Sequence, residues 1–460
     1  MKKIIKQAIS AVLAIASILS VASCGSEKAD TKTATVWMNV GSSKEYWTNR
    51  FKEFNETKGK ELGVKVVFEA KTDSSYTQAL DVAIQSDQLP DFFSCWSLEE
   101  LTELDRIVAL DDLPNMEEYL APYKDFMTET VHKINGKIYS IPQGMTTRGL
   151  IYNKDMFKEA GLVDENGEAK PPKTLAEFRE YAKILTDADN NKYGVVFPIK
   201  WQSWVESDIL ALAQSNSGRP VYDPVTGEYD YTILEPIVET IMGMKEDGSV
   251  YPGAEGLDND PARARFAEGV IGMKLSYSFD VGVLNTQFPA KCDWGVAPLP
   301  VEDVNNSYKQ VANVGNSMQI SKHGVENLGA ETAAEIFRWI YSDENTREIY
   351  KQGLEIPCIW SMVSDVELGE DAPKGWLDFC ELAEISVTAP LGMPMSIEGK
   401  EKISEVVLNR IWTGEKNISD ALKEQNTVAN EGVQLYKETH PDIDYSIYID
   451  KDWEAKVKKN

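Results

Sequence analysis

The stretch Ile134–Asn153, INGKIYSIPQGMTTRGLIYN, decides how this chain is organised. Asn135-Gly136 lies between two β-prone runs, which is the strongest short-range signal for a tight type I′ hairpin. Pro142 is excluded from the interior of a sheet, so the chain has to leave the hairpin's sheet there. Gly149–Tyr152 then predicts a new strand. A chain that ends one sheet and opens another within so short a stretch indicates a crossing between two lobes.

The same stretch, continued by KDMFKEAGL, resembles the crossover of family 1 extracellular solute-binding proteins of ABC importers, "NGKxYxIP…xxLxYNKDxFxxAGL". Phe266–Met273 is similar to that family's F-x-x-G-x-x-x-M motif. Thr332–Tyr350 resembles its helix pair and Trp412–Leu422 its G-x-x-s-x-x-x-A-L run, all in the family's order. Asp87–Asp91 is similar to the family's s-g-x-x-P-D run but has Gln88 where glycine is usual. The resemblance covers nearly the whole chain after the leader.

Strands are predicted at Ala34–Val40, Val64–Ala70 and Pro90–Trp96, with helical patterns between them. Strands that alternate with helices predict a parallel sheet, and ligands of such sheets sit beyond the carboxyl ends of the strands. The resemblance implies a two-lobed α/β fold of the type II periplasmic-binding-protein kind, each lobe a mainly parallel sheet flanked by helices.

The chain is expected to cross between the lobes about three times, near Pro142–Arg148, Val311–Asn316 and Gly353–Pro357. Residues 34–145 with 313–353 would then form the first lobe, and residues 146–312 with 354–460 the second. Several crossings along one line predict a hinge about which the lobes close on a ligand.

Composition describes a globular chain. Its 460 residues are long enough for more than one core, with 42% hydrophobic and 10% aromatic residues. The net charge of −27 repels phosphate backbones, so nucleic acid is not an expected partner. No cofactor is expected, and nothing indicates an oligomer, so a monomer is expected.

The N-terminus has the order of a secretory signal. Residues 1–23 place Lys2, Lys3 and Lys6 before an apolar run, and small residues precede Cys24. The run around Cys24 looks like a bacterial lipobox, which implies cleavage before Cys24 and lipid on its sulfur. Residues 24–33 would then be a flexible tether, and the folded part would stay at the outer face of the cytoplasmic membrane.

Catalysis has no support in the sequence. The 3 histidines lie in unrelated segments, and no nucleophile elbow, Walker loop or H-E-x-x-H motif occurs. With 74 acidic residues, a carboxylate pair that cleaves glycans stays open as an alternative.

Free thiols are preferred over disulfides for Cys95, Cys292, Cys358 and Cys380. Asp187, Asp189 and Asn191 fit an Asx-rich turn better than a calcium loop, so no metal site is predicted.

Aromatic residues indicate the ligand class. Several follow predicted strands or crossings: Trp96, Trp201, Trp204, Tyr277, Phe279 and Trp360. Indole and phenyl faces stack on the C–H faces of sugar rings, while hydroxyls need planar polar partners. The alternative is that each ring packs in a core.

By resemblance, ligand contacts come from the loop after the first strand, the end of the third strand, the crossings and the strand ends of the second lobe. The full predicted set is Ser42, Lys44, Glu45, Trp96, Gln143, Arg148, Trp201, Trp204, Tyr277, Phe279, Asp280, Asn316, Glu355 and Trp360. Glu99 and Glu100 stand near where maltodextrin-binding members use a basic residue, so the sugar of those members does not carry over to this chain.

The predicted function is therefore that of a substrate-binding lipoprotein. It would bind a carbohydrate, with an oligosaccharide preferred, and deliver it to the permease of an ABC importer. A lipid-anchored glycan-degrading enzyme is one alternative, and the same fold with a non-sugar solute is the other.

Overall fold

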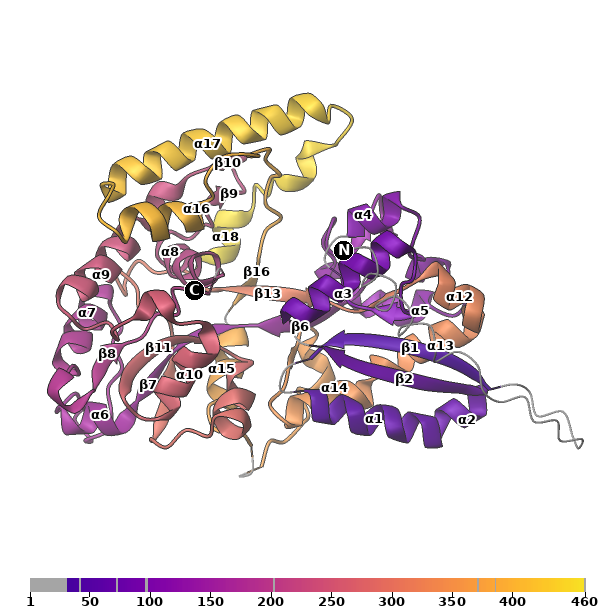
Figure 1. The fold of residues 1–460 in the computed structure, drawn as a ribbon, viewed down its shortest axis with the longest axis horizontal. Helices are drawn as coiled ribbons and strands as arrows, with labels where there is room; N and C mark the ends of the chain where they lie inside the picture. The colour runs from indigo at the N-terminus through magenta and orange to yellow at the C-terminus, as the bar shows by residue number, and fades with distance from the viewer. Residues whose placement is uncertain are drawn as a thin grey trace, which may run out of the picture.

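The structure is a computed structural model that describes residues 31–40, 43–71, 73–95, 98–201, 203–369, 372–384 and 386–458. Two lobes lie side by side and are joined through β6 (Pro142–Thr146) and β13 (Val311–Asn316) (Figure 1). The N-terminal strands and helices build the first lobe, on the right of Figure 1, together with α12 (Lys322–Leu328) and α13 (Ala330–Ile340). The predicted two-lobed α/β fold is confirmed.

The first lobe is built on a four-stranded sheet of order β14-β3-β1-β2. β1 (Lys32–Asn39) pairs in parallel with β2 (Val64–Lys71) and β3 (Phe92–Phe93), and β14 (Gln319–Ile320) is antiparallel to β3. Apolar side chains of α13 and of the helix after β1 cover the sheet, so that Phe54, Phe92 and Phe337 are fully buried. The further helices of this lobe are α1 (Lys44–Glu56), α2 (Lys58–Leu62), α3 (Asp73–Ser86), α4 (Leu98–Glu103), α5 (Glu117–Leu120) and α14 (Asp343–Lys351).

The predicted hairpin is present. β4 (Lys133–Ile134) pairs antiparallel with β5 (Lys137–Ile138), and the turn residues Asn135 and Gly136 have φ of 51° and 76°. Positive φ at both central residues is what a type I′ turn requires, and asparagine and glycine tolerate it best. Pro142 then occupies the first position of β6, where a missing N–H costs little.

The second lobe is built on a sheet of order β12-β7-β11-β8. β7 (Arg148–Asn153) is antiparallel to β11 (Ile271–Tyr277) and to β12 (Trp294–Ala297), and only β8 (Tyr193–Val195) is parallel to β11. The prediction of a mainly parallel sheet is wrong for this lobe. β7 enters the lobe from the hinge while β11 returns to it, so Arg148 at the start of one strand pairs with Tyr277 at the end of the other.

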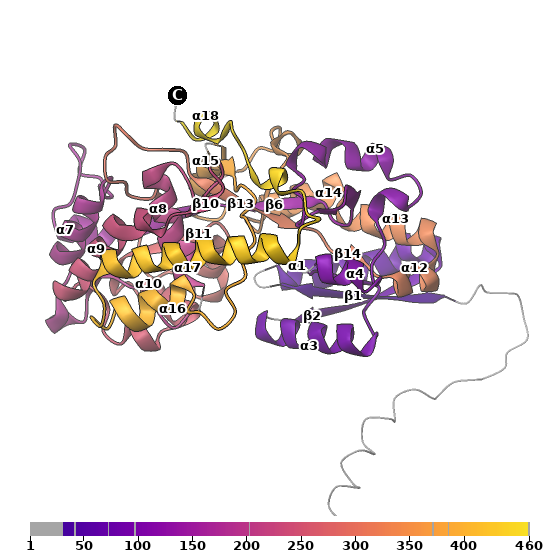
Figure 2. The same cartoon turned by 90° about the horizontal axis from the view of Figure 1, so that it is seen from above.

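Helices surround this second sheet. Asn153 caps the first of them, accepting from the backbone N–H groups of Asp155 (3.1 Å) and Met156 (3.2 Å). The helices are α6 (Lys154–Glu159), α7 (Leu175–Ile184), α8 (Leu210–Ser217), α9 (Glu235–Glu246), α10 (Asn259–Ala267), α11 (Asp280–Gly282), α15 (Trp376–Glu384), α16 (Ile403–Glu405), α17 (Ile418–Thr439) and α18 (Trp453–Val457), with a small hairpin of β9 (Tyr222–Asp223) and β10 (Glu228–Tyr229). Seen from above, the long α17 extends along this lobe toward the first (Figure 2).

A third four-stranded sheet joins the lobes, with the order β15-β6-β13-β16. β13 and β15 (Ile356–Pro357) both run antiparallel to β6, so the three predicted crossings lie in one sheet. β16 (Val387–Thr388), which the sequence did not indicate, adds a short parallel edge to β13. We refer to these four strands as the hinge sheet.

Candidate functional site

Two predicted ligand contacts form a pair in the hinge sheet. The Gln143 amide donates to both carboxylate oxygens of Glu355, at 2.9 and 3.1 Å. Gly144 provides the room, because a Cβ there would stand 2.5 Å from Glu355 Cγ. Burial raises the pKa of Glu355 to about 7, and the Gln143 hydrogen bond opposes the shift. The pair therefore presents a carboxyl group whose charge changes near neutral pH.

Asn316 contributes a third polar group from the hinge sheet. Its Nδ2 donates to the carbonyl oxygen of Cys95 at 2.7 Å, which ties the end of β13 to the chain just after β3. The sequence places Trp96 directly after that carbonyl. Trp96, Ser42 and Cys24 lie outside the described residues, and their roles remain predictions.

An aromatic cluster stands at the second-lobe end of the hinge. The Tyr277 and Phe279 rings stack with centroids 4.9 Å apart and planes at 4°, and Trp201 meets Tyr277 edge-on at 5.9 Å. Phe279 is 37% exposed, whereas Tyr277 is 2% exposed. Tyr277 was predicted as a ligand contact, but it lies behind the other two rings because β11 carries it into the lobe.

A buried ionic cluster supports these rings; we define it as Arg148, Asp208, Arg263, Lys274 and Asp280. Lys274 and Asp280 are 1% and 0% exposed, and Lys274 Nζ lies 3.9 Å from Asp280 Oδ2. Arg263 donates to Asp280, and Tyr277 donates its hydroxyl to Asp208. Burial raises the pKa of Asp208 to about 6 against the attraction of Lys274 and Arg148. Burial also lowers the pKa of Lys274.

Two members of this cluster were predicted to contact ligand. Asp280 has no exposed surface, and its oxygens accept from Arg263, Ser276 and the Tyr277 backbone, so it holds the lobe together instead. Arg148 is also buried, with its guanidinium 5.5 Å from the Tyr277 ring centroid and Nη1 3.5 Å from the Val311 carbonyl oxygen. Asp280 is therefore fully engaged by internal partners, whereas Nε of Arg148 is buried without a hydrogen-bond partner among the described residues.

Trp204 and Trp360 differ in burial. Trp204 is 0% exposed and packs against Phe197 at 5.4 Å and Trp412 at 6.5 Å. It belongs to the hydrophobic core of the second lobe, and its prediction as a ligand contact is wrong for this arrangement. Trp360 is half-buried, follows β15 closely, and meets Tyr350 edge-on at 6.0 Å.

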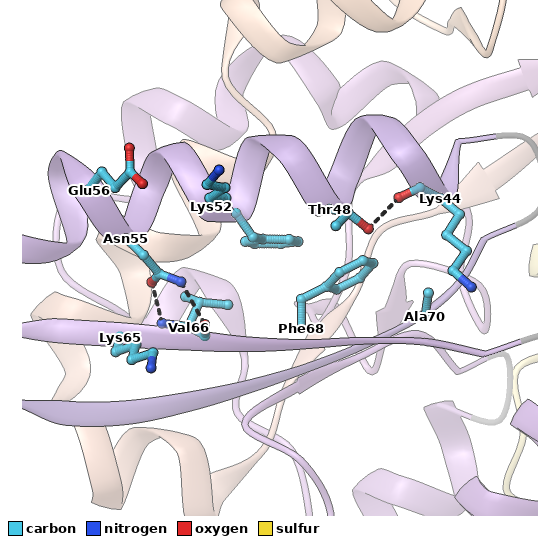
Figure 3. Close-up of a pocket in the computed structure, with 10 residues that line it drawn as sticks. Lys44, Thr48, Lys52, Asn55, Glu56, Lys65, Val66, Phe68 and Ala70 are labelled. Carbon is cyan, nitrogen blue, oxygen red and sulfur yellow. Dashed lines mark hydrogen bonds between the residues drawn. The ribbon is translucent and has the colours of Figure 1, made fainter.

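The predicted first-lobe contacts Lys44 and Glu45 open α1 and are exposed. Lys44 also lies at one end of a groove of about 470 Å³, lined only by α1 and β2 (Figure 3). Asn55 closes the edge of β2 there, donating to the Val66 carbonyl oxygen at 2.8 Å and accepting from its N–H at 2.7 Å. The groove therefore lies within the first lobe, and Asn55 blocks a further strand from adding at Val66.

A hollow of about 540 Å³ is lined by both lobes, and none of the ligand-set residues that the structure describes lines it. The first lobe supplies α4 and Thr130, and the second supplies Tyr436 and His440 near the end of α17. Its α4 residues are Leu98, Glu99, Glu100 and Glu103. The unusual acids at positions 99 and 100 were the only sequence signal for it. The lobes therefore also approach each other away from the hinge sheet.

The described residues form neither a metal-binding cluster nor a disulfide. Asp187 accepts from Asn190 N at 3.3 Å and from its Nδ2 at 2.6 Å, an Asx-type turn. Within the described ranges, no group of three or more His, Cys, Asp or Glu side chains is placed to hold a metal ion. In the same part of the chain, Cys95, Cys292, Cys358 and Cys380 form no disulfide, and no helix has the length and apolar character needed to cross a membrane.

Comparison with known proteins decides the family. Residues 40–347 match the family model described as bacterial extracellular solute-binding protein. The chain belongs to this family. It is thus a member of a family of bacterial extracellular solute-binding proteins.

Its curated relatives are distant. The chain is 25% identical over 305 residues to the sn-glycerol-3-phosphate-binding periplasmic protein UgpB of Pectobacterium atrosepticum, covering 63% of this chain and 64% of that protein. It is 29% identical over 241 residues to the maltotriose-binding protein of Pyrococcus abyssi, covering 52% and 47%. The chain thus spans less than two thirds of either relative.

Solved structures share the fold over most of both chains. The GacH receptor of Streptomyces glaucescens, studied with acarbose, superposes with a TM-score of 0.67 at 16% identity, covering 90% of this chain and 99% of that one. The maltose/maltodextrin-binding domain MalE of Bdellovibrio bacteriovorus, bound to maltotriose, gives 0.64 at 14% identity, covering 87% and 100%. At these identities the likeness concerns the fold.

Proposed function

We propose that this solute-binding protein takes an uncharged oligosaccharide between its lobes and delivers it to an ABC importer permease. We further propose that a lipid on Cys24 holds it at the outer face of the cytoplasmic membrane, and that it acts as a monomer. The sugar-binding names of the maltotriose-binding relative and of the structural neighbours support the carbohydrate class.

One observation carries the proposal: the hinge sheet holds three polar side chains, and an aromatic pair of exposed Phe279 and half-buried Trp201 lies at the adjoining end of the second-lobe sheet. Gln143, Asn316 and Glu355 come from the three crossings, and Trp201 and Phe279 stand at the second-lobe side of the same sheet. Amide and carboxylate groups bind hydroxyls, and aromatic faces stack on sugar rings. A ligand there meets both lobes and both kinds of contact.

Charge separates a neutral sugar from the anionic solute named for the glycerol-phosphate-binding relatives. Arg263 and Lys274, two cations of the second-lobe strand ends, each form an ion pair with the buried Asp280. The first-lobe side of the interlobe hollow carries acids on α4. A phosphate at the second-lobe strand ends would find Arg263 and Lys274 already paired with Asp280, so the charge balance there favours an uncharged ligand.

The test is a thermal-shift and X-ray scattering series with maltotriose, mannotriose, longer glucans and sn-glycerol-3-phosphate. A bound oligosaccharide at 100 times its Kd should add about 2.7 kcal/mol of stability. It should also reduce the radius of gyration, because a ligand touching both lobes favours the closed state. Stabilisation by glycerol phosphate alone would overturn the sugar proposal. Shortened glycans after incubation would instead favour the enzyme alternative.

Trp360→Ala is expected to weaken sugar binding by about 1–3 kcal/mol, a magnitude taken from aromatic hot spots at interfaces. Trp360 is half-buried beside the hinge, so the melting temperature of the unliganded protein should change little. Trp376→Ala is the matched control, because its fully buried ring also packs on Tyr350, at 5.8 Å. Calorimetric titration and melting curves of both variants distinguish a ligand contact from a core residue. Normal sugar binding with a large drop in melting temperature for Trp360→Ala would show that Trp360 belongs to the core.

Cys24→Ser is expected to release the protein from the membrane or leave its signal uncleaved. A serine hydroxyl cannot form the thioether to the lipid that the lipobox predicts. Fractionation and mass spectrometry of the N-terminus give the result. Normal processing with unchanged membrane retention would contradict the lipid anchor.

A further inference from the structure

Tyr277 holds together groups from four separate elements, although almost none of its surface is exposed. Its ring stacks on Phe279, meets the edge of Trp201 and lies under the Arg148 guanidinium. Its hydroxyl donates to Asp208, which belongs to the π-helical turn Val205–Ile209. Only the two outer rings, Phe279 and Trp201, have surface that a ligand can reach.

We propose that Asp208 and Tyr277 are positioning residues, which fix the relative placement of the Phe279 and Trp201 rings and thereby the sugar that the cleft accepts. The hydroxyl bond holds the far end of the Tyr277 side chain in place, and the two flanking rings pack against that fixed ring, one face-on and one edge-on. This inference rests on the proposed function for its ligand, but the ring placement itself can be tested without one.

Burial explains why this bond can act as a fixed point. Asp208 is 3% exposed and lies within the attraction of Lys274 and Arg148, so turning its carboxylate away from Tyr277 would not expose it to water. A hydrogen bond to a buried charged group is stronger and more directional than one between neutral groups. The π-helical turn adds support, since such turns occur often at functional sites.

A purely structural role predicts a different result. If the Tyr277–Asp208 hydrogen bond only stabilised the lobe, removing any comparable buried hydroxyl bond would change the cleft to the same extent. Tyr229 offers that comparison: it is buried in the same lobe, and its hydroxyl donates to the Met393 carbonyl oxygen at 2.6 Å. Tyr277→Phe and Tyr229→Phe each remove one such hydroxyl and no ring.

The first measurement needs no ligand. 4-Fluorophenylalanine placed at position 279 gives one fluorine resonance that reports the surroundings of that ring. We expect Tyr277→Phe to shift or broaden it, Asp208→Asn to do so less because one acceptor oxygen remains, and Tyr229→Phe to leave it unchanged. A parent-like resonance in Tyr277→Phe, or an equal change in Tyr229→Phe, overturns the proposal. If Tyr277→Phe fails to fold, a parent-like resonance in Asp208→Asn overturns it.

The second measurement uses maltotriose and mannotriose as probes. For whichever binds, Tyr277→Phe should raise Kd roughly tenfold, as expected for losing one strong polar interaction, while Tyr229→Phe at a similar melting temperature should not. Equal Kd values for Tyr277→Phe and the parent would refute the specificity role even with a changed resonance. If no glycan binds the parent protein, the proposed function fails, and the fluorine result still decides the placement of the rings.

Discussion

Replacing Lys274 by methionine should lower the free energy of unfolding by about 3–5 kcal/mol, the range for breaking a buried ion pair. Lys274 is 1% exposed, lies 3.9 Å from Asp280, and donates to the Leu275 carbonyl oxygen at 2.8 Å. Without its charge, Asp280 keeps only Arg263 as an ion-pair partner, and Asp208 loses the cation that most favours its charged form. Urea unfolding at neutral pH measures the loss.

An exposed lysine provides the control. Lys322 pairs with Asp105 on the surface, with side chains 43% and 78% exposed. Lys322→Met should change the unfolding free energy by less than about 1 kcal/mol, since solvent and salt screen such pairs. If Lys274→Met and Lys322→Met lower the unfolding free energy by equally small amounts, the ionic cluster is hydrated in solution. It then does not form a buried scaffold beneath the aromatic pair.

Glu355→Gln should stabilise the protein at pH 8 by about 2–3 kcal/mol relative to its effect at pH 5. The folded-state pKa of Glu355 is raised to about 7 from an ordinary value of 4.5. Its contribution is therefore fully present below pH 4.5 and is lost as pH rises through 7, where the buried carboxyl must ionise. Glutamine keeps the shape and never ionises, so the wild type should lose more stability across this window than the variant, which keeps only the loss due to Asp208 and other groups.

Unfolding free energies of wild type and variant at several pH values between 5 and 8 test this. The exposed Glu165, changed to glutamine, should show a pH-independent difference from wild type. Parallel pH curves for Glu355→Gln and the wild type would mean that water reaches the carboxylate. The same ionisation changes the site, because a protonated Glu355 can donate to a sugar hydroxyl and an ionised one only accepts.

Local signals in the sequence determined the connections between elements. Asn135-Gly136 has the positive φ values that its turn requires, and Pro142 takes the one strand position that tolerates it. These outcomes depend on backbone sterics and on hydrogen bonds between near neighbours, which operate before any tertiary contact forms. The crossings at Pro142, Val311 and Ile356 could therefore be placed, and the family motifs follow the same order.

The site was only partly predictable for the opposite reason. An aromatic residue after a strand has the same local pattern whether it faces a cleft or a core, and Trp204 proved to be core while Phe279 is exposed. Asp280 is likewise indistinguishable in sequence from a ligand-binding acid, yet Arg263 and Lys274 neutralise it from distant positions.

The sequence by itself determined the two-lobed plan, the hairpin, the crossings and the residue types gathered near the hinge. Tertiary structure alone decided the antiparallel pairing of β7 with β11, the burial of Tyr277 behind exposed Phe279 and half-buried Trp201, and the approach of α17 to α4. The physical reason is range: turn and strand preferences act over a few residues, whereas burial and charge pairing depend on groups that only the completed fold brings together.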